Sequence, residues 1–353
     1  MNDNNSYSLR KTREFTDALL DWARGRGKVL IVIHDHPDPD SLASAMALKH
    51  LFTMKLNRDS VIGFSGMISR GENIAMVREL ELVLTPLETL KPDDFSMVCM
   101  LDTQPGTGNN SLPPGVMVDL VVDHHPMRQA SGECRWVDIR DDYGATATIL
   151  YEYLKAQDVS MGTKLATALF YAIKSETQDL GREAGRADRS AYLNLFPLTN
   201  KTLLYEITHP RLGPAHFQAM YTALANTLIY GNVLVAAMGE LSSPEAAAEM
   251  ADYLVRLKGI DVAMCMGRDR DAVILSLRTT RQDLNAGELM RKLVAGQGTA
   301  GGHGMTAGGR IVVGPSAPLD FHRLEEDLTQ RLLAETGVSA CAPRALIGRR
   351  AGV

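Results

Sequence analysis

The stretch VLIVIHDHPDPDSLASAMAL, residues 29–48, decides the fold that the sequence predicts. Its first five residues form an apolar run that predicts a strand, and the pattern after Asp40 predicts a helix. His34, Asp38 and Asp40 lie between the two, so residues that can bind a metal crowd the carboxyl end of the strand. Ligands of open α/β sheets bind at such ends, and two carboxylates two positions apart can approach two neighbouring ions. A plain Asp-Pro turn is the alternative, with Asp40 or Ser41 as the N-cap of the helix.

Two further apolar runs end in the same kind of residue. The run over 97–101 ends at Asp102, and the run DLVVD ends at Asp123, which His124 and His125 follow. A single aspartate at a strand end is commonly a cap or turn residue, but chance seldom ends three consecutive strand-like runs in this way. Histidine and carboxylate ligands without cysteine favour Mn²⁺ or Mg²⁺ over Zn²⁺. The sequence therefore predicts a divalent-metal site at one edge of a sheet.

The organisation of the chain predicts two α/β domains. Its 353 residues exceed the length at which one hydrophobic core usually stops growing, and 45% of them are hydrophobic. We expect an N-terminal domain with a parallel sheet, a smaller C-terminal α/β domain and an active-site cleft between them. The expected bounds are 1–195 for the first domain, 196–229 for a helical connector, 230–340 for the second domain and 341–353 for a basic tail. The expected strands in the second domain cover 233–238, 262–266 and 273–277, and its expected helices cover 246–257 and 287–293.

The strand-end motifs resemble those of the DHH phosphoesterase superfamily, and the resemblance covers nearly the whole chain. The namesake motif stands as Asp123-His124-His125, and residues 34–41 are similar to the first motif of the family. The resemblance implies a catalytic first domain with two divalent ions, for which Mn²⁺ is favoured and Mg²⁺ is the other candidate. It also implies that His34 and Asp38 hold one ion, that Asp40 and His124 hold the other, that Asp102 bridges them and that His125 faces the phosphate.

The stretch AIKSETQDLGR, residues 172–182, resembles the fourth motif of the family, which presents an aspartate to the second metal. Here Glu176 occupies that place. A glutamate is a competent ligand but one methylene longer, so the metal could shift or bind less tightly, or Asp179 could take over the role. A third alternative is that neither carboxylate binds metal, which would leave the second metal site impaired. Arg182, which ends this stretch, is a weaker candidate for binding phosphate.

A glycine-rich segment lies near the C-terminus. Residues 296–301 satisfy the pattern GxGxxG, but they follow a helix-like segment and precede a strand, so we reject a dinucleotide-binding fingerprint. Residues 301–309 resemble instead the glycine-histidine signature of the C-terminal domain associated with DHH proteins. That resemblance implies substrate binding by Gly301, Gly302, His303 and Gly304, and by Arg278 at the end of the run VILSLR. A tight structural turn and an exposed strand-end arginine are the alternatives.

Within the family, the length and the two-domain plan resemble the NrnA-type oligoribonucleases, which degrade very short RNA and dephosphorylate 3′-phosphoadenosine 5′-phosphate. The expected function is therefore a two-metal phosphodiesterase or phosphatase acting on short oligonucleotides, an exonuclease of the nanoRNase kind, with Asp102 and His125 as catalytic residues. A phosphodiesterase for cyclic or linear dinucleotides is the alternative within the family. A catalytically weakened, nucleotide-binding regulatory protein is the alternative from another class.

The net charge and the hydropathy of the chain limit the classes of molecule that we expect it to bind. A net charge of −5 disfavours binding to long duplex nucleic acid, which needs a strongly basic surface. No apolar stretch approaches the ~20 residues that span a membrane, and residues 1–15 lack the apolar core of a signal peptide. We therefore expect a cytoplasmic protein that binds a short oligonucleotide or a nucleotide and no membrane. A homodimer is an expectation from the family alone.

Overall fold

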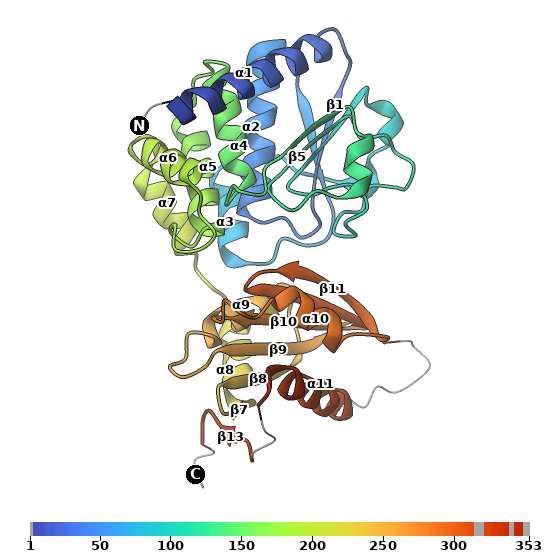
Figure 1. The fold of residues 1–353 in the computed structure, drawn as a ribbon, viewed down its shortest axis with the longest axis vertical. Helices are drawn as coiled ribbons and strands as arrows, with labels where there is room; N and C mark the ends of the chain where they lie inside the picture. Colours follow the sequence, from blue (N-terminus) through green and yellow to red (C-terminus); the bar gives the residue numbers. More distant parts are fainter. Residues whose placement is uncertain (1–2, 314–320, 339–341, 349–353) are drawn as a thin grey trace. The chain divides into compact units, whose positions relative to one another are not determined.

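The computed structural model describes residues 3–313, 321–338 and 342–348, and Figure 1 shows their helices and strands. The chain divides into two compact units, Met1–Pro210 and Arg211–Val353. The first contains a parallel sheet and the second a mixed sheet, which confirms the predicted α/β fold class with a parallel-sheet N-terminal domain. The expected cleft between the two domains stays a prediction.

The first unit is built on a sheet with the strand order β3-β2-β1-β4-β5-β6, in which neighbouring strands pair in parallel. The predicted strands over 29–33 and 97–101 have the expected bounds. The strands are β1 (Val29–Ile33), β2 (Ser60–Phe64), β3 (Thr85–Pro86), β4 (Met97–Leu101), β5 (Leu120–Asp123) and β6 (Trp136–Ile139). The helices are α1 (Asp3–Ala23), α2 (Pro39–Leu56), α3 (Gly71–Glu79), α4 (Thr146–Ala156), α5 (Thr163–Glu176), α6 (Arg186–Leu195) and α7 (Lys201–Thr208).

The pleat of this sheet divides its apolar side chains between two cores. In β1, Val29, Ile31 and Ile33 belong to the large core that the helices cover. Leu30 and Val32 point to the opposite face, where they pack against loop residues and the short 3-10 helix η1 (Leu87–Thr89). The strand is buried on both faces because each face has its own cover, which explains its unbroken apolar sequence.

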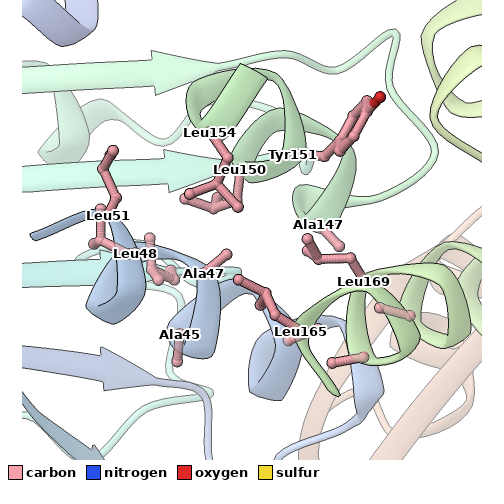
Figure 2. Packing of buried hydrophobic residues seen from close by; sticks show 14 of the residues in the cluster. Ala45, Ala47, Leu48, Leu51, Ala147, Leu150, Tyr151, Leu154, Leu165 and Leu169 are labelled. Carbon is pink, nitrogen blue, oxygen red and sulfur yellow. The ribbon is translucent and has the colours of Figure 1, made fainter. Parts of the chain in front are cut away.

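The helix α2 lies at the centre of the large core and fixes the turn that precedes it. Figure 2 shows buried residues of α2, among them Ala47, Leu48 and Leu51, beside those of α4 and α5, against which the helix packs. Asp38 is the N-cap of α2, because its Oδ1 accepts a hydrogen bond of 3.0 Å from the Ser41 backbone N–H. The alternative with Asp40 or Ser41 as N-cap is therefore wrong, since the helix begins before Asp40. Asp40 is left with its carboxylate available for contacts outside its own helix.

The second unit contains a sheet with the order β11-β12-β10-β9-β8-β7-β13, in which only the β8–β9 pair is parallel among the described strands. Its two faces are covered by α8 with α9 and by α10 with α11. The strands are β7 (Thr227–Tyr230), β8 (Val233–Glu240), β9 (Val262–Asp269), β10 (Ala272–Thr279), β11 (Gly298–His303), β12 (Thr306–Val312) and β13 (Arg344–Ala345). The helices are α8 (Pro214–Ala225), α9 (Glu245–Leu254), α10 (Ala286–Leu293) and α11 (Phe321–Thr336).

The segment expected as a helical connector, residues 196–229, is divided between the two units. The boundary falls after Pro210, so that α7 belongs to the first unit and α8 to the second. The helical pattern expected to continue toward Ile229 stops earlier, because Thr227–Tyr230 pairs with β8 as a hairpin around Gly231.

Part of the expected basic tail is ordered in a strand. The short strand β13 pairs with β7, and residues 341 and 349–353 of that tail lie outside the described part of the chain. Over the ranges that the structure describes, no helix combines the length and the apolar character needed to cross a membrane.

Candidate metal centre

The register of three parallel strands brings the predicted ligands to one level of the sheet. Ile33 of β1 lies opposite Leu101 of β4, and Leu101 lies opposite Val122 of β5. The residues that follow, His34, Asp102 and Asp123, therefore lie side by side at the carboxyl edge. The chain adds β2 and β3 on one side of β1 and then returns to add β4 on the other. The strand order thus reverses between β1 and β4, which is where open α/β sheets bind ligands.

Two groups of side chains face each other across Asp102. His34 Nε2 lies 3.4 Å from Asp38 Oδ1 and 3.6 Å from Asp102 Oδ2. His124 Nε2 lies 3.6 Å from Asp102 Oδ1 and 3.9 Å from Asp40 Oδ2. These separations exceed normal hydrogen bonds, but two ligands each ~2.1 Å from one ion lie ~3.0 Å apart at a right angle and up to ~4.2 Å apart when opposite, so the separations suit a shared ion. Each oxygen of Asp102 therefore faces a different histidine, as the predicted bridging role requires.

The two histidines are oriented by their other ring nitrogens. His34 Nδ1 lies 2.8 Å from the Asp35 carbonyl oxygen, and His124 Nδ1 lies 3.2 Å from the Tyr143 carbonyl oxygen. A proton on each Nδ1 donates to the carbonyl, which leaves Nε2 to face the carboxylates. Histidines that bind metals are commonly held in this way.

Asp40 is anchored by the first amides of α4. Its carboxylate is buried, and it accepts hydrogen bonds of 2.7 Å from the backbone N–H groups of Thr146 and Ala147. These are among the amides that a helix cannot satisfy internally, and the positive end of the helix dipole favours the carboxylate. The Thr146 hydroxyl donates to Asp102 Oδ1 at 2.9 Å, so one residue braces both acids. Asp102 itself has a left-handed φ of 57°, an uncommon conformation that is often found at functional sites.

The electrostatics of these acids fit a divalent cation. Burial, with repulsion from neighbouring carboxylates, raises the pKa of Asp40 and of Asp102 well above the usual value. Burial also opposes protonation of His34, but the Asp38 carboxylate outweighs it and raises the pKa of His34 to about 9. So many buried acids cannot all be charged without positive charge beside them. The oxygen and imidazole donors, without thiolate, suit Mn²⁺ or Mg²⁺.

His125 is held by the aspartate that precedes it in its motif. Its Nδ1 lies 2.9 Å from Asp123 Oδ1, and Asp123 Oδ2 accepts a hydrogen bond of 2.8 Å from Gln104 Nε2. Gln104 is fully buried, and its Oε1 accepts from the Arg128 backbone N–H and the Ser131 hydroxyl, both at 2.8 Å. Gln104 therefore ties Asp123 to the loop that follows the motif. The sequence analysis did not identify Gln104 or Thr146; the position of Gln104 two residues after Asp102 was the available signal.

The structure gives Glu176 and Asp179 different surroundings. Glu176 ends α5 half-buried, and burial followed by repulsion from Asp38 raises its pKa to about 7. Asp179 is exposed, and it accepts a hydrogen bond of 2.9 Å from the Tyr192 hydroxyl and another from Lys174 Nζ. Neither carboxylate belongs to the two groups of possible metal ligands whose atoms lie within 4.8 Å of one another in the described chain. Glu176 interacts with those groups, whereas Asp179 is engaged elsewhere.

The predicted substrate-binding residues of the second unit lie at one end of its sheet. Arg278 of β10 lies opposite Thr306, which begins β12 and in turn pairs with His303 of β11. The segment expected as a loop is therefore a hairpin, and residues 296–301 open no helix. The Arg278 guanidinium is already engaged, with Nε 2.5 Å from Asp252 Oδ1.

The glycines of this hairpin differ in whether the backbone around them leaves room for a side chain. A Cβ on Gly302 would lie 2.4 Å from the Thr306 carbonyl oxygen of the neighbouring strand, and its φ is +129°, so the hairpin requires a glycine there. A Cβ on Gly301 would meet open space, so packing does not explain that glycine. The hairpin turn spans Gly304 and Met305, and the side chain of His303 lies outside the described part.

Comparison with known proteins supports the division of the chain. A model described as the DHH family, N-terminal domain, matches residues 28–173, and a DHHA1 domain model matches residues 230–330. An uncharacterized protein of Methanocaldococcus jannaschii is 33% identical over 291 residues, which cover 82% of this chain and 59% of that protein. A second protein of that organism, also uncharacterized, is 23% identical over 332 residues, which cover 89% of this chain and 94% of that protein. The chain thus spans only 59% of the length of the first relative.

Solved structures show the same fold at low sequence identity. An exopolyphosphatase-related protein from Bacteroides fragilis has a TM-score of 0.75 at 13% identity, with 92% of this chain and 97% of that chain covered. RecJ from Thermus thermophilus in complex with Mn²⁺ has a TM-score of 0.53 at 15% identity, with 92% of this chain and 54% of that chain covered.

We expect Mn²⁺ to bind with release of protons and with an affinity that rises with pH. His34, with a pKa of about 9, and Glu176, with a pKa of about 7, must lose their protons before they can bind metal. The raised pKa of His34 stabilises the metal-free fold fully below 6.5, and this stabilisation is lost as pH rises through about 9. The gain in Tm from Mn²⁺ should therefore grow over that range. Calorimetry in two buffers of different ionisation enthalpy measures the released protons, and a pH-independent affinity would contradict the assignment.

We expect the Gln104→Leu substitution to lower kcat roughly 10- to 100-fold, as is usual when the support of a catalytic residue is removed. Asp123 and His125 would lose their fixed orientation, while the number of bound metal ions stays the same. Steady-state kinetics and metal analysis measure the two quantities. Gln129→Leu, at an exposed amide in the same loop, is the matched control and should behave as wild type. Equal kcat in the two variants would exclude the positioning role.

We expect Glu176→Gln to weaken Mn²⁺ binding at least about tenfold, because it removes the charge but keeps the shape. Asp179→Asn, an equally conservative change, should leave the affinity within about twofold of wild type because its carboxylate bonds Lys174 and Tyr192. Calorimetric titration compares the two variants. The opposite ranking would assign the ligand to Asp179, and no effect in either would indicate a site without this ligand.

Proposed function

The chain contains a DHH-family N-terminal domain followed by a DHHA1 domain, and on this premise we propose that it is a two-metal phosphodiesterase for short oligonucleotides or nucleotides. Members of the DHH superfamily are metal-dependent phosphoesterases. The observation that carries the proposal is the contact of Asp102, whose two oxygens lie 3.6 Å from Nε2 of His34 and of His124. This arrangement fits a carboxylate shared between two ions.

Two divalent ions bound by His34, Asp38, Asp40, Asp102 and His124 would activate a water molecule and stabilise the charge that develops on the phosphoryl oxygens. The protein's own contribution is a rigid arrangement of these donors. Asp40 cannot turn away, because both of its oxygens accept amide hydrogen bonds from α4. Asp102 is held by Thr146 in the same way. The donors are therefore in place before the substrate arrives, which lowers the cost of reorganisation.

His125 is the proposed group that acts on the phosphate. The hydrogen bond between its Nδ1 and Asp123 fixes the ring, and Nε2 is the nitrogen that we assign to the substrate. Burial opposes protonation of this ring, but the hydrogen bond and the charge of Asp123 raise its pKa above the usual value. A ring that is readily protonated can donate a hydrogen bond to a phosphate oxygen or a proton to the leaving oxygen.

The substrate and the metal are proposed from composition, from a similar solved structure and from the family resemblance. The length and net charge of −5 favour short substrates over long duplexes. The RecJ of Thermus thermophilus was solved with Mn²⁺, which supports Mn²⁺ as the ion used. Substrate reading by Gly301, Gly302, His303, Gly304 and Arg278 rests on the family resemblance, as do 3′-phosphoadenosine 5′-phosphate as a further substrate and the homodimer. The cytoplasmic location stays a prediction.

We expect purified protein with Mn²⁺ to cleave an RNA dinucleotide well ahead of an RNA 20-mer, and EDTA to stop the reaction. A panel that also contains 3′-phosphoadenosine 5′-phosphate, a cyclic dinucleotide and pyrophosphate separates the alternatives within the family. Preference for the cyclic dinucleotide would replace the proposed substrate. Hydrolysis of none of them would favour a nucleotide-binding protein with a weakened site.

In the same assay, Asp102→Asn should lower the rate at least ~100-fold, because it removes the shared ligand. Its circular dichroism should match that of wild type, since asparagine keeps the shape of the side chain. Asp93→Asn, at an exposed carboxylate, is the control and should keep full activity. Hydrolysis retained by Asp102→Asn would remove Asp102 from the mechanism.

A further inference from the structure

Arg182 is a nearly buried guanidinium that makes no hydrogen bond within the described residues. Its side chain is 14% exposed, and its Nε is buried without a partner. The nearest carboxylate oxygen that pairs with it, Glu183 Oε2, lies 3.9 Å from Nε, beyond hydrogen-bonding distance. A buried charge without hydrogen bonds costs several kcal/mol, so proteins seldom keep one without a ligand or a catalytic reason. The charge of Arg182 also acts on Glu176, whose pKa it lowers, but no group of the described residues accepts a hydrogen bond from its Nε, so the guanidinium can bind a further anion.

A tight turn after α5 holds Arg182 in this position. Gln178, Asp179 and Leu180 all have left-handed φ values, of 48°, 58° and 66°. The Arg182 backbone N–H then donates to the Thr177 carbonyl oxygen at 2.9 Å, which closes the turn. Three consecutive non-glycine residues in this conformation are strained, and such strain tends to collect at functional sites. The turn brings the arginine back beside the end of α5.

The Arg182 side chain lines a cavity of about 440 Å³. This volume lies within the range of small-ligand sites, roughly 300–1,000 Å³. Arg189 also lines the cavity, and its guanidinium donates a hydrogen bond of 3.0 Å to the carbonyl oxygen of Ala184, another lining residue. Asp142 and Glu183 line it as well, but both residues are exposed to solvent. The arginine is the buried charge of the cavity.

The wall of this cavity and the metal centre rest on the same support. The buried carboxylate of Asp188 accepts hydrogen bonds of 2.8 Å from the backbone N–H groups of Gly185, in the cavity wall, and Gly144. Two residues after Gly144, Thr146 donates to Asp40 and Asp102. The cavity is therefore held in a fixed relation to the metal centre by a short chain of hydrogen bonds within one unit.

We propose that Arg182 and this cavity bind a second phosphate group of the substrate, one that is not cleaved at the metal centre. The inference rests on the proposed function and narrows its substrate class to short oligonucleotides with a terminal phosphate. The planar fork of a guanidinium matches two phosphate oxygens, and a buried arginine binds them more strongly than an exposed one. A phosphate bound in the cavity would accept hydrogen bonds from the guanidinium, which Glu183, at 3.9 Å from Nε, does not.

The test compares hydrolysis of three adenylyl dinucleotides by the full chain with Mn²⁺: one with a 5′-phosphate, one with a 3′-phosphate and one with neither. We expect one phosphorylated form to have a kcat/KM at least about tenfold above the unphosphorylated form, mainly through KM. Arg182→Gln should bring this ratio close to one, and Arg182→Lys should keep part of it. Arg24→Gln, at an exposed arginine that directly follows α1, should keep the wild-type ratio.

Several outcomes would overturn the proposal. The proposal is wrong if the wild type hydrolyses all three dinucleotides with the same kcat/KM. It is also wrong if Arg182→Gln keeps the wild-type preference for a phosphorylated dinucleotide. An equal loss for all three substrates would instead show that Arg182 acts on Glu176. If wild type hydrolyses none of them, the proposed function has failed. Calorimetry then tests this inference by the ratio of the Kd values for unphosphorylated and phosphorylated dinucleotides, which Arg182→Gln should bring close to one.

The melting temperature gives a readout that does not depend on activity. Without substrate, Arg182→Met should be at least as stable as wild type, because a largely buried charge whose Nε has no hydrogen-bond partner is replaced by an apolar side chain of similar length. A clear fall in Tm would show that Arg182 supports the fold and would count against a ligand site.

Discussion

The candidate site depends on the parallel pairing of β1 with β4, in which Ile33 lies opposite Leu101. This register places His34 beside Asp102, although 68 positions separate them, and the pairing of β4 with β5 adds the DHH motif at the same level. A slip of one residue would turn Asp102 to the other face of the sheet, because side chains alternate along a strand. The register is secured by two separate cores, one on each face of β1. The hydrophobic effect that stabilises the sheet thus also sets the spacing of the ligands.

The helix α4 joins the stability of the first unit to the geometry of its site. Along its length α4 packs against α2, as Figure 2 shows, and its first amides hold the Asp40 carboxylate. Asp40 belongs to the first turn of α2, so the two helices are linked by packing and by hydrogen bonds. The orphan amides of a helix usually find a cap from nearby in the sequence, but α4 has no side-chain cap of its own. A distant acid takes this role here, and it is held more rigidly than a surface carboxylate could be.

The charges around the site are arranged for ligands rather than for stability. Burial and mutual repulsion raise the pKa of Asp40 and of Asp102, and Arg182 keeps a buried nitrogen without a partner. Both features cost free energy in the metal-free, substrate-free protein, because ions buried without partners lose their hydration. Local departures from the rules of stable folding are expected at functional sites. The carboxylates fit cations, and the guanidinium fits an anion that approaches beside them.

The sequence by itself determined the fold class, the bounds of β1 and β4, and the residue types gathered at the strand ends. These features depend on local periodicity and on residues next to each other in the chain, so a single sequence can reveal them. It left open whether Glu176 or Asp179 serves the site, and it did not identify Gln104, Thr146 or Asp188 as supports. The folded structure identifies these supports, and it gives Glu176 and Asp179 different surroundings. Hydrogen bonds such as the one from Thr146 to Asp40 join residues 106 positions apart, and the left-handed turn after α5 directs two nearby acids differently. Such contacts exist only once the packed helices have fixed where each side chain points.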